Sequence, residues 1–162
     1  MNLNRDEITA TAERLQGKVI RTKVISIEPR LSLKLESDQH SGSFKARGAI
    51  NAMLCSDVGP DGVVAASGGN HGAAVAWAAQ ALGYRANIFV PSIISQSKLE
   101  RLQSYEAEIH VVGNEYQQSL EAARSFQVGR QCIELHAYDQ TEIVLGAGTI
   151  AAEIDDQASE AT

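Results

Sequence analysis

From residue 57 onward, short apolar runs alternate with stretches whose apolar residues recur at helical spacing. Runs of small and β-branched residues predict buried strands at 62–66, 86–90, 108–112 and 131–135. The helical spacing predicts helices near 70–82, 95–105 and 115–127. Strands and helices that alternate in this order form parallel sheets with right-handed crossovers. The pattern therefore predicts an α/β fold of three layers, a parallel sheet with helices on both faces.

The N-terminal part of the chain is patterned differently. Met1–Leu15 has the spacing of an amphipathic helix, and Thr22–Ile27 and Leu31–Glu36 predict two strands joined by a turn at Pro29. A further helix is expected over residues 44–54, with Ser43 as its N-cap.

Lys45 would then lie in the first turn of that helix. The positive end of the helix dipole disfavours a cation there, and burial acts in the same direction, so the pKa of this amine should fall below the usual value of about 10.4. A lysine in this environment is suited to forming a Schiff base, and Phe44 beside it offers a flat face to a ring. The alternative is an ordinary solvated lysine.

A second loop carries glycines at the end of the strand predicted at 62–66. Ser67, Gly68 and Gly69 break the strand, Asn70 is a good N-cap, and an apolar helix begins at His71. A strand, a glycine turn and a helix N-terminus form an anion site, because unpaired N–H groups point outward there. Taken alone, this is also compatible with an ordinary strand-to-helix loop and a structural or capping histidine.

Four segments in this order resemble the fold type II family of pyridoxal-phosphate (PLP) enzymes, and most of all its serine/threonine dehydratase (ammonia-lyase) branch. They are Leu33–Glu36, Ser41–Ala49, Ala66–Gly72 and Gly146–Ile154. The resemblance implies a lyase that converts L-threonine or L-serine to a 2-keto acid and ammonia.

The resemblance also implies roles for individual residues. Lys45 would form the Schiff base with the cofactor and carry the proton, Phe44 would pack against the cofactor ring, and Asn70 would contact its phenolic oxygen. The substrate carboxylate would be held by a loop that consists of Ser67, Gly68, Gly69, Asn70 and His71. No metal site is expected. Serine racemases of this family carry a second serine where this chain has Gly68, which favours elimination; a β-replacement synthase remains an alternative.

Family members are roughly twice as long, so the resemblance predicts that this chain is truncated. Residues 57–140 would form the small domain, and residues 1–56 and 141–162 would belong to a larger domain whose remainder, with the phosphate-binding loop, is absent. Apolar faces around 22–36 and 141–154 should then be uncovered. We expect a homo-oligomer or association with a missing C-terminal half, and a non-catalytic assembly fragment is a second reading of the chain.

Glu142–Ala151 imitates the dinucleotide-binding pattern of strand, GxGxxA and helix. The pattern also needs an acidic residue about 20 positions later, on a second strand, which this sequence does not supply. The resemblance instead places these glycines inside a helix.

Composition narrows the class of protein further. The 162 residues are 44% hydrophobic, which is sufficient for a core. Their net charge of −6 makes nucleic acid an unexpected partner. No apolar run approaches the length of a membrane span. The two cysteines, Cys55 and Cys132, support neither a disulfide framework nor a zinc site, and a cytoplasmic location is expected.

Overall fold

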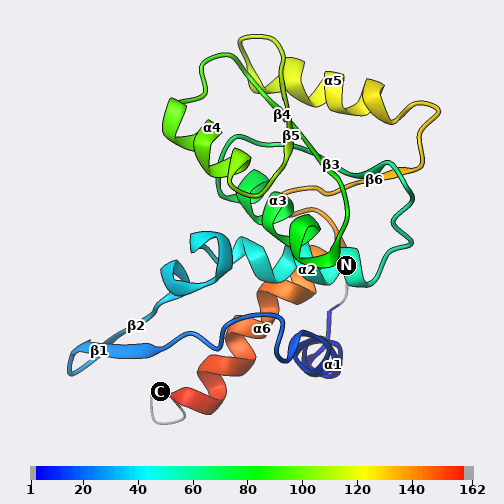
Figure 1. The fold of residues 1–162 in the computed structure, drawn as a ribbon. Helices are drawn as coiled ribbons and strands as arrows, with labels where there is room; N and C mark the ends of the chain where they lie inside the picture. Colours follow the sequence, from blue (N-terminus) through cyan, green and yellow to red (C-terminus); the bar gives the residue numbers. More distant parts are fainter. Residues whose placement is uncertain (1–2, 159–162) are drawn as a thin grey trace.

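The computed structural model describes residues 3–158, and a parallel four-stranded sheet forms its upper part in Figure 1. The strands follow the order β5-β4-β3-β6 across the sheet. Their bounds are β3 Gly62–Ala66, β4 Ala86–Val90, β5 Glu108–Val111 and β6 Cys132–Glu134. All three neighbouring pairs are parallel, with Val63 opposite Ala86 and Ile133, and Asn87 opposite Glu108. The predicted parallel sheet is confirmed, and each strand lies within two residues of its expected range.

Helices cover both faces of this sheet. Helix α3 (Asn70–Leu82) packs on the face that carries Val63 and Ile88, while α5 (Tyr116–Gln127) packs on the opposite face, which carries Val64 and Phe89. A third helix, α4 (Gln96–Gln103), lies beside α3. Neighbouring strand residues face opposite sides of a sheet, so a run of apolar residues fills both cores. The three layers predicted from the alternation are confirmed.

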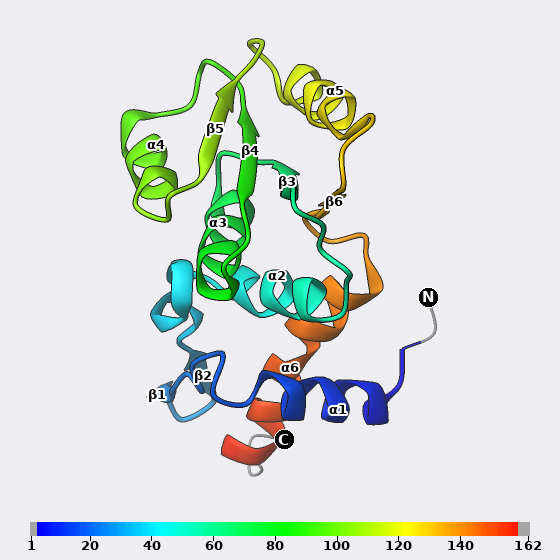
Figure 2. The ribbon, with the colours of Figure 1, turned by 45° about the vertical axis from the view of Figure 1, so that its right-hand side comes forward.

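The remaining elements lie below the sheet in Figure 2. They are α1 (Arg5–Leu15), the hairpin β1 (Val24–Glu28) and β2 (Leu31–Lys34), the short turns η1 (Glu36–Asp38) and η2 (His40–Gly42), α2 (Lys45–Leu54) and α6 (Thr141–Gln157). Helix α2 lies between α3 and α6, and α1 packs on α6. Helix α2 is therefore the element that joins the sheet layers to the lower part of the molecule.

Two glycines allow α2 and α6 to approach closely. A Cβ added to Gly146 would lie 2.5 Å from the backbone oxygen of Arg47, and one added to Gly48 would lie 2.8 Å from that of Ile143. Glu142–Ala151 lies entirely within α6, with no strand before the glycines. The expectation that these glycines lie inside a helix is confirmed, and Gly146 serves helix packing.

Two expected helix caps are also wrong. Ser43 has extended backbone angles, but its buried hydroxyl makes no hydrogen bond to any described residue; α2 begins at Lys45 after Phe44. Helix α3 begins at Asn70 itself, after an extended Gly69. Asn70 cannot cap this helix because its side chain is held elsewhere, as described below.

Surface exposure agrees only in part with the expected apolar faces. Ile25, Ile27, Leu31 and Leu33 of the hairpin are between 36% and 51% exposed. Helix α6, by contrast, packs against α1 and α2 and buries Ile143 and Thr149, while its Ile154 is 37% exposed. Within residues 3–158, no helix has the length and apolar character that crossing a bilayer requires.

Candidate active site

Lys45 is the first residue of α2, and its side chain reaches the loop that follows β6. Its Nζ donates a hydrogen bond to the backbone oxygen of Ala137 at 2.6 Å and lies 4.9 Å from the ring centre of Phe44. Burial lowers the pKa of the Lys45 amine from its ordinary value. The position at a helix start acts in the same direction, so both effects favour the neutral amine more than in an exposed lysine.

A largely apolar pocket of about 230 Å³ opens beside this amine. Its walls come from α2, from the loop after β6 and from α6, and its lining residues are Phe44, Lys45, Gly48, Ala137, Tyr138, Ile143, Val144 and Ala147. A cavity of about 150 Å³ accommodates benzene. The pocket is therefore large enough for a single substituted aromatic ring, with one amine in its wall.

The glycine loop follows β3 and folds back on the start of α3. The Gly69 N–H donates to the Ser67 hydroxyl at 3.3 Å. A Cβ on Gly72 would lie 1.9 Å from the backbone oxygen of Ser67, so only glycine permits this close return. A Cβ on Gly68 would lie 2.7 Å from Cδ1 of Ile94. The loop therefore presents backbone and a single hydroxyl at the carboxyl end of β3.

His71 is buried and connects this loop to the segment after β6. Its Nε2 lies 2.8 Å from the backbone oxygen of Leu135, and Nε2 carries the hydrogen because a carbonyl can only accept. Burial, opposed by this hydrogen bond and assisted by the charges of Lys45 and His136, lowers the pKa of His71 to about 4. His71 is therefore neutral at pH 7, and the Lys45 charge is near enough to affect it.

Asn70, one residue earlier, is bound by a residue that sequence reasoning did not identify. Its Oδ1 accepts a hydrogen bond from Nη1 of Arg101 on α4 at 3.2 Å. Nη2 of Arg101 donates to the backbone oxygen of Ser41, just before the lysine helix. No hydrogen bond joins Asn70 to Lys45 among the described residues. Nothing in the sequence of α4 sets Arg101 apart from a solvated helix arginine.

The loop Leu135–Gln140 is a second feature that sequence reasoning missed. The His136 N–H donates to Oε1 of Gln140 at 2.9 Å, and Nε2 of Gln140 donates to the backbone oxygen of Glu134 at 2.8 Å. Nδ1 of His136 accepts from the Asp139 N–H at 3.0 Å. These bonds fix the two carbonyl groups that receive the Lys45 and His71 side chains.

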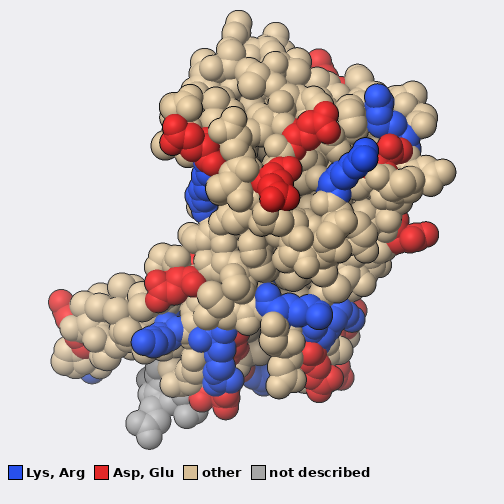
Figure 3. Space-filling model, viewed as in Figure 1, with Lys and Arg blue, Asp and Glu red and all other residues tan. Residues whose placement is uncertain are grey.

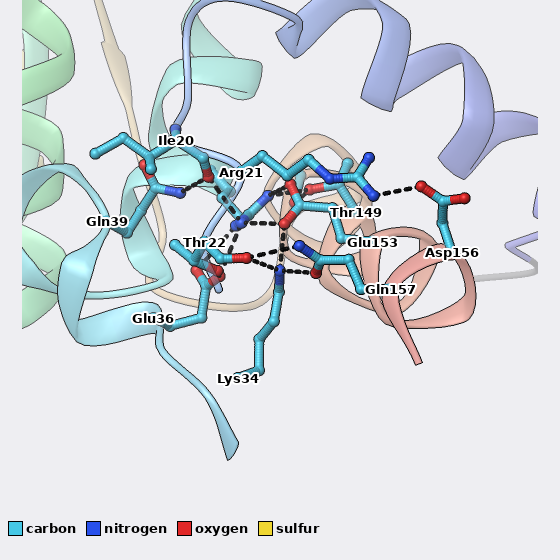
Figure 4. Close-up of polar contacts among 12 residues, drawn as sticks. Ile20, Arg21, Thr22, Lys34, Glu36, Gln39, Thr149, Glu153, Asp156 and Gln157 are labelled. Carbon is cyan, nitrogen blue, oxygen red and sulfur yellow. Dashed lines mark hydrogen bonds and ion pairs between the residues drawn. The ribbon is translucent and has the colours of Figure 1, made fainter. Parts of the chain in front are cut away.

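Behind the lysine helix lies a buried charge cluster, part of which is drawn in Figure 4. Arg47 is fully buried and donates to both oxygens of Glu36, at 2.8 and 2.9 Å, and to both oxygens of Glu153, at 2.7 and 3.0 Å. Nζ of Lys34 donates to Glu153 at 2.5 Å. The cluster ties the hairpin, α2 and α6 together, and it accounts for Glu36 and Arg47 in the segments that carry the family resemblance.

Comparison with known proteins decides the family. Residues 16–162 match the family described as pyridoxal-phosphate dependent enzymes. The chain belongs to this family. PLP is the cofactor of the family, and the Lys45 pocket has the amine and the apolar walls that such a ring requires.

Relatives within the PLP-dependent enzymes are consistent with the predicted branch. The chain is 32% identical to a putative threonine dehydratase of Sinorhizobium fredii, over 94% of this chain and 49% of the relative. It is 39% identical to an L-threonine ammonia-lyase of Thermotoga maritima, over 75% of this chain and 31% of the relative.

Solved structures of PLP-dependent enzymes share the fold over nearly the whole chain. Maize serine racemase superimposes with a TM-score of 0.93 at 30% identity, covering 99% of this chain and 51% of that one. A threonine deaminase of T.th. superimposes with a TM-score of 0.89 at 32% identity, covering 98% of this chain and 53% of that one. The chain spans about half the length, or less, of the proteins it matches.

Proposed function

We propose that this chain contributes the lysine and substrate loops of a PLP-dependent ammonia-lyase that converts L-threonine or L-serine to a 2-keto acid and ammonia. The observation that carries this proposal is the position of Lys45. Its amine, with a lowered pKa, lies in the wall of a ring-sized pocket. His71 of the glycine loop and Lys45 both contact carbonyl groups of the loop after β6, on Leu135 and Ala137, which supports a shared site.

Each residue of the site would have its own role. Bound PLP supplies an electron sink for the substrate's α-carbon. Lys45 would hold the cofactor covalently and, once displaced by the substrate, would move the α-proton at Nζ. Phe44 would pack on the ring and Asn70 would donate to its phenolic oxygen. The N–H groups of Ser67–Asn70, with neutral His71 behind them, would bind the substrate carboxylate at the start of α3.

Gly68 favours elimination over racemisation. Racemisation needs a second proton donor on the opposite face of the substrate, and Gly68 offers no side chain there. The neighbouring Cδ1 of Ile94 occupies the space next to it. A β-replacement synthase stays an alternative. It would be supported if the reaction strictly required an added nucleophile and gave no keto acid without one.

Titration of the chain with PLP tests the proposal. We expect a visible absorbance band of amine-bound PLP that is absent in Lys45→Ala. The matched control is Lys98→Ala, which removes an exposed lysine of α4. The role of Lys45 would be contradicted if the unaltered chain gave no band, or if Lys45→Ala gave an equal band. Either result would favour the alternative that the chain is a non-catalytic assembly fragment.

We further propose the division into a small domain, residues 57–140, and parts of a larger one, residues 1–56 and 141–162. It is supported by the sheet and its helices, all of which lie between Gly62 and Gln127 apart from β6. The hairpin projects from the molecule with a mostly uncharged surface (Figure 3). Its exposed residues Ile25, Ile27, Leu31 and Leu33 support association with a second copy or with a chain equivalent to the other half of the relatives.

Light scattering at increasing concentration tests this association. A monodisperse monomer that binds no C-terminal half of a relative would contradict it.

A cytoplasmic location is also proposed, on the grounds that the two cysteines are both free.

A further inference from the structure

Arg101 joins the two sides of the candidate site. It belongs to α4, beside the glycine loop, and its two terminal nitrogens donate to different partners. Nη1 donates to Oδ1 of Asn70 at 3.2 Å, and Nη2 donates to the backbone oxygen of Ser41. Ser41 lies in the segment that leads into Lys45. One guanidinium group therefore links the loop proposed to bind substrate to the loop that carries the lysine.

The chemistry of the guanidinium group decides the orientation of the Asn70 amide. Arginine has only donors, so Asn70 must turn its oxygen toward Arg101. The Nδ2 group, with its two hydrogens, is then directed away from Arg101. Within residues 3–158, Nδ2 of Asn70 donates to no other group. It is thus available as a donor to an oxygen outside the protein.

The backbone around Ser41 is shaped to receive the arginine. Ser41 has a φ of 54° and Gly42 a φ of 66°, both in the left-handed region, which a non-glycine residue such as Ser41 rarely adopts. A Cβ on Gly42 would lie 3.2 Å from Nη2 of Arg101. The turn thus directs a carbonyl at the guanidinium group and leaves room for it. Hydrogen bonds from a charged donor are stronger than neutral ones, which favours a link through Arg101 between the exposed Asn70 and the Ser41 carbonyl.

We propose that Arg101 is a positioning residue for Asn70: it holds the side-chain amide with Nδ2 facing the phenolic oxygen of PLP, and it ties that amide to the lysine loop. The inference rests on the proposed function, because it needs Asn70 to contact the cofactor. Helix α4 would thus take part in cofactor binding, a role that its sequence does not indicate.

The first test needs no cofactor. In the chain alone, side-chain ¹H–¹⁵N relaxation of Asn70 should report a restricted amide in the unaltered protein and in Arg101→Lys, which keeps a donor. It should report a mobile amide in Arg101→Met. Lys98→Met, which removes the same charge from an exposed position on α4, is the matched control and should leave Asn70 restricted. Equal mobility in Arg101→Met and the unaltered chain would overturn the contact.

The second test measures the affinity for PLP through the Lys45-dependent band. We expect Arg101→Met to weaken binding about tenfold, since one charge-assisted hydrogen bond contributes about 1.5 kcal/mol and 1.4 kcal/mol is tenfold. Arg101→Glu should weaken it further, because a carboxylate accepts from Nδ2 and turns the Asn70 oxygen toward the cofactor. Arg101→Lys should recover most of the affinity, and Lys98→Met should match the unaltered chain.

The two tests separate the possible failures. If the unaltered chain shows the band and both Arg101→Met and Arg101→Glu bind PLP as tightly, the positioning role is overturned while the proposed function stands. If no Lys45-dependent band forms in the unaltered chain, the proposed function fails and the positioning role falls with it, whatever the relaxation of Asn70 shows.

Discussion

At the scale of single residues, the candidate site depends on two side chains whose charge states are set by their surroundings. Lys45 and His71 donate to carbonyl groups two residues apart, on Ala137 and Leu135. Both are pushed toward the neutral form, mainly by burial. With His71 neutral at pH 7, the backbone N–H groups at the helix N-terminus attract an anion in the glycine loop.

The nearness of Lys45 and His71 predicts a coupled titration. The Lys45 charge is one of the causes that lower the pKa of His71 to about 4. In Lys45→Met this repulsion is absent, so the pKa of His71 should rise, as measured by NMR titration of the imidazole. Lys98→Met should leave the pKa unchanged. An unaltered pKa in Lys45→Met would show that the amine does not face His71.

The same shift predicts how stability depends on pH. The pKa of His71 is lower in the folded chain than its ordinary value of 6.5, so its contribution to stability is complete above that value. This contribution should be lost as the pH falls from about 6.5 toward 4, because in this range the unfolded chain binds a proton at His71 and the folded chain does not. Urea unfolding across this window should show a smaller loss in His71→Gln than in the unaltered chain.

At the scale of elements, the site is positioned by the contact of α2 with α6, and that contact depends on glycines. The residue at position 146 meets the backbone of Arg47 and Gly48, which cannot move without displacing the lysine helix. Gly148 of the same helix faces only the side chain of Ile8, with its nearest atoms 3.3 Å from an added Cβ.

This difference predicts opposite effects for two similar substitutions. Gly146→Ala should reduce the free energy of unfolding by about 2–3 kcal/mol, since overpacking against backbone forces the helices apart. Gly148→Ala should be neutral or stabilising by up to about 1 kcal/mol, because alanine favours a helix and the end of Ile8 can move. Chemical denaturation measures both values. An equal effect of the two variants would contradict the tight contact.

At the scale of the whole molecule, the buried cluster around Arg47 holds distant parts of the chain together. Glu153 of α6 accepts from Arg47 of α2 and from Lys34 of the hairpin. Burial acts to raise the pKa of Glu153, but the hydrogen bonds from Arg47 and Lys34 outweigh it, and the pKa lies below its ordinary 4.5. The ionised form is therefore the one that folding favours.

Acid should weaken this connection. The contribution of Glu153 to stability is complete above pH 4.5 and should be lost as the pH falls through the lower pKa of the folded chain. Glu153→Gln should cost about 3 kcal/mol at pH 7, since it leaves Arg47 with one buried partner instead of two. The difference from the unaltered chain should narrow below pH 4.5. Asp155→Asn, at an exposed pair with Arg5, is the control and should change stability by less than about 0.5 kcal/mol.

The sequence by itself determined the layers, the strand and helix ranges and the candidates Lys45, Asn70 and His71. Periodicity and glycine turns are properties of neighbouring residues, so they can be read along the chain. The family resemblance added the roles of these residues, which the experiments above test.

Only the tertiary structure decided which side chains meet. Arg101 and Ser41 are 60 residues apart, and Arg47 and Glu153 are 106 apart. The expected cap at Asn70 failed for a related reason, because the Asn70 side chain pairs with Arg101 of another helix and does not bond its own backbone. Such partners are set by packing between elements, and no local pattern encodes them.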